Sequence, residues 1–170
     1  LANLEETEVP VTEETPAEPE EPVKEEISET PVTVSFTDVP TDKFYAKPIA
    51  WAVENNITSG TSKTTFSPDQ TCTNAQILTF LWKAMGQPEA TIENPFTDVD
   101  ESEYYYKAAL WAYENGVVYD TVLNANEPCT RAMTVIYQWR AAHQPMSEPA
   151  DFTDVKTDET KQDAWAIGWA

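Results

Sequence analysis

The chain of 170 residues has few of the groups on which enzymes and metal centres depend. It contains one histidine, His143, and no CxxC pair, which leaves zinc and thioredoxin-like chemistry unsupported. Its four glycines form no Gly-rich phosphate loop, and no serine lies in a nucleophile motif. We therefore expect a protein that is not an enzyme and that has no cofactor, no metal site and no catalytic residue.

Long apolar runs and positive charge are also scarce. No stretch approaches the roughly 18 to 20 apolar residues that a membrane-spanning helix needs. The 30 Asp and Glu outnumber the 10 Lys and Arg, so the net charge of −20 argues against nucleic acid as a partner. Leu1 is followed at once by acidic sequence rather than by a signal peptide, and we expect a processed or excised chain.

Much of the negative charge lies in the first 35 residues. Residues 1–35 contain eleven Glu, five Pro, one Lys and no aromatic residue. Such a segment cannot bury enough apolar surface to offset the entropy of ordering itself. We predict a disordered acidic linker over 1–35, which is either a stalk for another part of the protein or an ordinary tail.

The rest of the chain repeats itself. The tetrapeptide FTDV begins at Phe36, Phe96 and Phe152. Residues 36–58 align with 96–118, and after a short deletion residues 71–88 align with 128–145. The third copy reaches only the start of its first helix. A repeat of this length is typical of stacked helical units.

Each full copy predicts a helix, a loop and a second helix. The first helices are expected over 44–56 and 104–115, with Pro48 in a first turn. The second helices should begin after capping threonines, Thr73 and Thr130. Gln76 completes a capping box at the first, whereas Met133 replaces the reciprocal residue at the second. Because these helices are apolar on most faces, we expect the copies to pack against one another.

These motifs resemble the S-layer homology (SLH) domain. The resemblance rests on FTDV, the WA helix, the Gly60 loop with Phe66 and Pro68, and the sequences TNAQ and TRAM that open the second helices. It implies an all-α fold of tandem repeats in a pseudo-threefold cluster, with the third repeat truncated. The implied domains are repeat 1 over 36–90, repeat 2 over 96–146 and a partial repeat 3 over 152–170.

The resemblance also implies where a ligand binds. In this family, grooves between repeats bind secondary cell-wall polysaccharide, often through a ketal-pyruvate carboxylate. Arg131 matches the arginine of the family's TRAE motif, whereas Asn74 stands at that position in repeat 1. Because a guanidinium grips a carboxylate through two charge-assisted hydrogen bonds, we predict an anionic sugar beside Arg131 and a weak or neutral-sugar site beside Asn74. The remaining candidate binding residues are Gly60, Thr73, Gln76 and Thr130.

Alternatives remain for several of these residues. Arg131 at a helix start is also suited to an ion pair with Asp98 or Glu127. Trp51 and Trp111 are either sugar platforms or core residues. Cys72 and Cys129, at equivalent positions, are either buried thiols or a disulfide.

The function predicted from the sequence is non-catalytic anchoring at a bacterial cell surface. The chain would be secreted and would bind cell-wall polysaccharide in the cell wall or S-layer. The alternative is a structural module that contacts other proteins at the cell surface. Association through the incomplete third repeat is a further prediction, because its missing helix would leave apolar surface uncovered.

Overall fold

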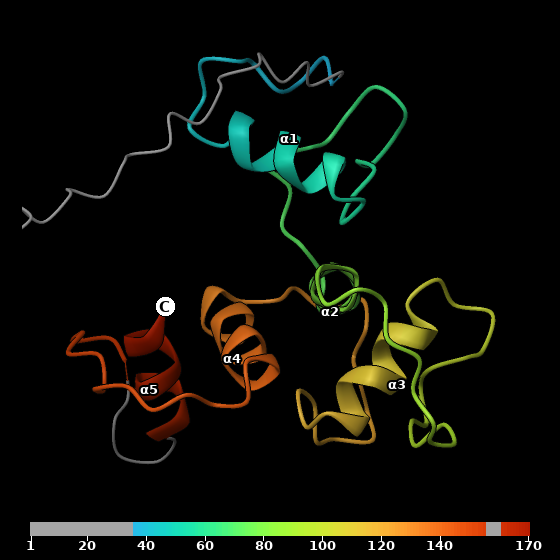
Figure 1. The fold of residues 1–170 in the computed structure, drawn as a ribbon, viewed down its shortest axis with the longest axis vertical. Coiled ribbons are helices and arrows are strands. Elements are labelled where there is room, and N and C mark those ends of the chain that lie inside the picture. The colour runs from blue at the N-terminus through green and yellow to red at the C-terminus, as the bar shows by residue number, and fades with distance from the viewer. Residues whose placement is uncertain (1–35, 156–160) are drawn as a thin grey trace, which may run out of the picture. The chain divides into compact units, whose positions relative to one another are not determined.

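The computed structural model describes residues 36–155 and 161–170, and the predicted linker of residues 1–35 lies outside the described residues. The described part is helical, and its β-structure is one isolated bridge between Thr73 and Pro128. None of its helices is long and apolar enough to cross a membrane. In chain order the helices are α1 (Ala46–Glu54), α2 (Asn74–Ala84), α3 (Tyr106–Glu114), α4 (Arg131–Ala141) and α5 (Lys161–Trp169) (Figure 1).

The first helix of each full repeat ends in the same way. The side-chain amides of Asn55 and Asn115 donate to the carbonyls of Trp51 and Trp111, at 2.8 and 2.9 Å. The next residue in each copy has a positive φ, 57° at Asn56 and 67° at Gly116. These are left-handed helix stops.

The second helices begin at the predicted caps. The Thr73 hydroxyl accepts from the Gln76 amide at 3.3 Å, and the Gln76 side chain accepts from the Thr73 amide at 2.9 Å. At α4 the Thr130 hydroxyl accepts from the Met133 amide at 3.1 Å without the reciprocal bond. The equivalent starts of α2 and α4 therefore differ by one hydrogen bond.

The FTDV motif holds the loop that precedes each second helix. Asp38 accepts from the backbone amides of Phe66 at 2.9 Å and Ser67 at 2.7 Å. Asp98 accepts in the same way from Leu123 and Asn124, both at 2.8 Å. The phenylalanine and valine of the first two copies are buried: Phe36, Val39, Phe96 and Val99. In the third copy Phe152 is exposed.

Helices of different repeats pack against one another. Helix α3 of repeat 2 contacts α2 of repeat 1, α5 contacts α4, and α2 contacts α4 (Figure 1). The main core lies mostly on α2, α3 and the loops that follow them, with Leu78, Ala112 and Val117 fully buried. The first helix of a repeat thus packs on the second helix of the preceding repeat, and the prediction that copies pack together is confirmed for these helices.

Helix α1 differs from α3 in its surroundings. Five consecutive residues of α3, residues 108–112, are buried, whereas α1 buries Ala46, Ile49 and Ala50. Trp51 is 58% exposed and the equivalent Trp111 is 4% exposed. The expectation of an enclosed first helix is therefore correct for α3 and wrong for the outer face of α1, because the described residues supply no preceding second helix for α1.

The two tryptophans form a matched test of this packing. We predict that Trp111→Ala lowers the free energy of unfolding by about 3 to 5 kcal/mol, since it removes a buried ring from the core. Trp51→Ala should change it by less than about 1 kcal/mol, because most of that ring already contacts water. Urea unfolding of the full chain measures both values. Equal losses would mean that α1 is as enclosed in solution as α3.

The loop contact of Asp38 predicts a pH dependence. Its hydrogen bonds from the Phe66 amide, the main cause, and from the Ser67 amide lower the pKa of the Asp38 carboxyl. Because the folded pKa lies below the unfolded value of about 3.9, this carboxylate stabilises the fold above that pH and stops doing so as the pH falls through the folded pKa. The melting temperature of Asp38→Asn should therefore lie below that of the unaltered chain near neutral pH, and the difference should shrink in acid.

The control for this prediction is Asp42→Asn, which removes an exposed aspartate from the turn between Val39 and α1. This variant should melt at the same temperature as the unaltered chain at every pH. A difference for Asp38→Asn that stays constant down to strongly acidic pH would contradict the assigned role of the carboxylate.

Candidate functional site

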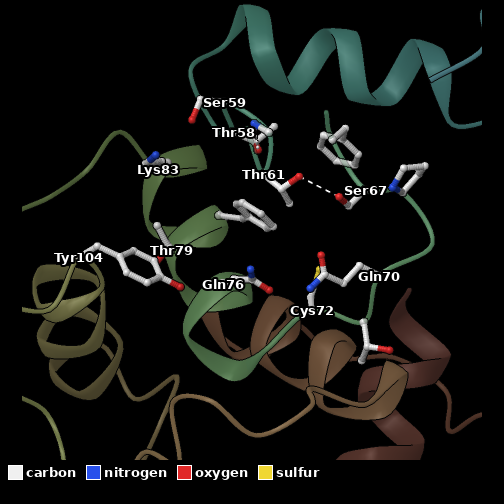
Figure 2. Close-up of a pocket in the computed structure, with 15 residues that line it drawn as sticks. Thr58, Ser59, Thr61, Ser67, Gln70, Cys72, Gln76, Thr79, Lys83 and Tyr104 are labelled. Carbon is white, nitrogen blue, oxygen red and sulfur yellow. Dashed lines mark hydrogen bonds between the residues drawn. The ribbon is translucent and has the colours of Figure 1, made fainter. Parts of the chain in front are cut away.

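A pocket of about 520 Å³ lies between the loop that follows α1, one face of α2, and Tyr104 just before α3 (Figure 2). Since Tyr104 belongs to repeat 2, the pocket is at the junction of two repeats. Its walls carry hydroxyl and amide groups, aromatic rings and one ammonium group. The lining residues are Thr58, Ser59, Gly60, Thr61, Phe66, Ser67, Pro68, Gln70, Thr71, Cys72, Gln76, Thr79, Phe80, Lys83 and Tyr104.

Gly60 gives the loop wall its shape. Its φ is +84°, and a Cβ atom placed there would lie 2.5 Å from the Phe36 ring and 2.6 Å from the Thr65 carbonyl oxygen. The loop therefore requires glycine for both its conformation and its space. In the same loop, the hydroxyls of Thr61 and Ser67 are hydrogen-bonded at 2.8 Å (Figure 2). The loop is thus held against the buried phenylalanine of the FTDV motif.

The α2 wall follows from helical spacing. Gln76, Thr79, Phe80 and Lys83 are three, four and seven residues apart and therefore share one face of the helix. The Thr79 hydroxyl donates to the Ala75 carbonyl at 2.7 Å and is buried. The Gln76 oxygen is used in the capping box, which leaves its amide nitrogen on the cavity side (Figure 2).

The electrostatics of the pocket differ from those of the chain. Of the described residues that line it, none is Asp or Glu and one, Lys83, is a cation, although the chain carries a net charge of −20. The ordinary pKa values of a tyrosine phenol and a cysteine thiol lie above about 7, and partial desolvation raises the pKa of Tyr104 and of Cys72 further, so both groups are neutral at neutral pH. The pocket therefore offers hydroxyl and amide hydrogen bonds, ring faces and one positive charge.

Four of the residues predicted in repeat 1 gather around α2. Gly60 and Gln76 line the pocket. Thr73 caps α2 next to it. The Asn74 side chain instead donates to the carbonyl of Asn124 at 3.1 Å and joins the two repeats. Asn74 thus acts as an inter-repeat contact in this structure.

The other predicted residues lie elsewhere. Thr130 and Arg131 are exposed at the start of α4, and within the described residues Arg131 forms no ion pair with Asp98 or Glu127. Trp51 is exposed on α1, whereas Trp111 is in the core, so its ring is not accessible to a sugar here.

The corresponding region of repeat 2 is built differently. Arg140 aligns with Lys83, and its guanidinium donates to the Val117 carbonyl at 3.0 Å and lies 4.6 Å from the centre of the Tyr119 ring. The Arg140 side chain therefore links α4 to the loop that follows α3. Asp120 replaces the loop glycine, as the alignment shows.

Sequence reasoning missed Lys83 and Tyr104 as pocket residues. The signal for Lys83 was present, because it lies two helical turns after Gln76 on the same face. Tyr104 had no comparable signal, since its position depends on how repeat 2 packs on repeat 1.

The geometry defines a module of interleaved helical repeats with a polar pocket at a repeat junction. The family model of the S-layer homology domain matches residues 35–78 and 95–132. The chain therefore carries S-layer homology repeats, as the sequence predicts. Domains of this family occur in cell-surface proteins and in general bind cell-wall polymers.

A curated relative is an endoglucanase from Bacillus sp. (strain KSM-635). It is 34% identical to this chain over 83 residues, which cover 49% of this chain and 9% of the endoglucanase. The match covers less than a tenth of the endoglucanase. The enzymatic activity in that protein's name is therefore not assigned to this chain.

The requirement for Gly60 can be tested against a second glycine. Gly86 has nearly the same φ, +86°, but a Cβ atom there would meet nothing within 4 Å. Gly86→Ala should therefore cost only the left-handed conformation, about 1 kcal/mol. Gly60→Ala should cost clearly more, because the new methyl group displaces the Phe36 ring. Thermal unfolding of both variants gives the comparison, and equal losses would show that the loop tolerates a side chain at this position.

Proposed function

We propose that this chain is a non-catalytic anchoring module that binds secondary cell-wall polysaccharide at a bacterial cell surface. The observation that supports it is the pocket at the junction of repeats 1 and 2. Its hydroxyl and amide groups match the hydrogen-bonding groups of a saccharide, and Phe66, Phe80 and Tyr104 supply ring surface for sugar C–H groups.

Lys83 favours a saccharide that carries an anionic group. A carboxylate in the pocket would meet one ammonium group and none of the repulsion that Asp or Glu in the wall would cause. This differs from the placement predicted from the sequence, in which the anionic sugar lies beside Arg131. Arg131 remains a second candidate because its guanidinium is exposed and forms no hydrogen bond among the described residues.

The proposed arrangement of the whole module is a pseudo-threefold cluster. Helix α3 packs on α2, and α5 packs on α4. In both cases the first helix of a repeat contacts the second helix of the preceding repeat. A third contact of this kind would place the second helix of another repeat on the exposed face of α1, around Trp51. The proposed boundaries of the repeats are 36–90, 96–146 and 152–170, after an acidic linker over 1–35.

A structural role at the cell surface is the second candidate. The observation that favours it is the apolar surface of α1 and the turn before it, where Phe44 is 91% and Trp51 is 58% exposed. Patches of this kind are typical of contacts with other proteins.

The test is binding of the full chain to purified cell walls, with and without their polysaccharide. Lys83→Ala should weaken binding by about tenfold or more, since it removes a hydrogen bond between charged groups worth about 1.5 to 3 kcal/mol. The matched control is Lys63→Ala, which removes the same charge from the neighbouring loop but outside the pocket lining. Sedimentation of the chain with the walls measures both.

Two outcomes would redirect the proposal. Loss of binding in Arg131→Ala but not in Lys83→Ala would place the anionic group at the start of α4. Undiminished binding to walls stripped of polysaccharide would remove the support for a saccharide ligand and favour the structural role.

A further inference from the structure

The two cysteines of the chain lie at opposite positions of two backbone segments that meet at the junction of repeats 1 and 2. The isolated antiparallel bridge pairs Thr73 with Pro128, so the residues on either side of it are also opposite each other. Cys72 and Cys129 form one such pair, and the Cys129 amide donates to the Cys72 carbonyl at 2.9 Å. On the other side, the Asn74 amide donates to the Glu127 carbonyl at 3.0 Å.

This geometry is suited to a disulfide. Directly opposite residues of an antiparallel pair have Cα atoms about 4.5 to 5.5 Å apart, within the roughly 4.4 to 6.8 Å that disulfides span. Their side chains emerge on the same face of the pair. Forming the bond would exchange the present contact of the Cys129 sulfur with the Thr134 hydroxyl, at 3.5 Å, for a contact with the Cys72 sulfur. In the structure both side chains are free thiols.

We propose that Cys72 and Cys129 are a redox pair, which a low-molecular-weight disulfide converts into an intramolecular disulfide that links repeat 1 to repeat 2. This inference does not depend on the proposed polysaccharide binding. It assigns a role to the only two cysteines of the chain.

The two thiols have different access, which sets the order of the steps. Cys72 lines the pocket and is partly exposed, whereas Cys129 is buried beneath the start of α4. The Cys72 thiolate attacks one sulfur of the small disulfide, forms a mixed disulfide and releases one small thiolate. The Cys129 thiolate then attacks the Cys72 sulfur and releases the second small thiolate. The protein loses two electrons and two protons, and the small disulfide becomes two thiols.

Burial also affects the rate. It raises the pKa of both thiols, and the Cys72 thiol is raised further by the neighbouring Cys129. Since the thiolate is the reactive form, oxidation should be slow at neutral pH and faster as the pH rises.

The experiment incubates the full chain with oxidised glutathione and follows it by intact mass, non-reducing electrophoresis and peptide mapping. The expected product is a monomer that has lost two hydrogen atoms, with the Cys72 and Cys129 peptides joined. Its melting temperature should rise by about 10 °C, because the bond closes a long loop in the unfolded chain, and dithiothreitol should reverse the rise.

Single variants test the order of the steps. Cys129→Ser should stop at a glutathione adduct on Cys72, whereas Cys72→Ser should react little because its remaining thiol is buried. An unaltered chain that stops at the glutathione adduct, or that forms disulfide-linked dimers, would overturn the proposal. A joined product that melts at the same temperature as the reduced chain would overturn the claim that the bond links the folded repeats.

Discussion

The packing of one repeat's first helix on the preceding repeat's second helix is the interaction on which the rest of this structure depends. Helices of 9 to 11 residues are too short to be stable alone in water. A single repeat has no partner for the apolar faces of both its helices. When α3 lies on α2, Trp111 and Leu78 enter a common core, and residues 108–112 leave water together. Much of the burial in this core therefore arises between repeats, whereas α1 packs on Phe36 and Val39 of its own repeat.

This packing also forms the pocket. It brings Tyr104, which directly precedes α3, to the α2 face that carries Gln76 and Lys83. The remaining wall is the loop fixed by Asp38 and Gly60. The pocket is consequently a product of two repeats, and a change in their packing would alter it even if every lining residue stayed the same.

Much of the local structure follows from the sequence, whereas the surroundings of equivalent residues do not. The caps at Thr73 and Thr130 and the helix stops at Asn56 and Gly116 depend on a few neighbouring residues, so short motifs predict them. Trp51 and Trp111 occupy the same position of the shared WA motif but differ in exposure, because among the described residues only Trp111 has a preceding second helix packed near it. The motif likewise identifies Arg131 as a candidate for binding an anion, but a motif does not show whether a cavity lies beside the side chain.

Repeat 2 shows how a shared framework allows different chemistry at equivalent positions. Asp38 and Asp98 hold their loops through the same pair of backbone hydrogen bonds, so the framework is retained in both copies. The cation on the second helix, in contrast, has different contacts in the two repeats. Lys83 faces the open pocket, whereas the Arg140 guanidinium is engaged by the Val117 carbonyl and the Tyr119 ring. An arginine bound in this way stabilises its own loop and is less available to a ligand. The equivalent regions of the two repeats therefore present different groups, although the repeats have the same fold.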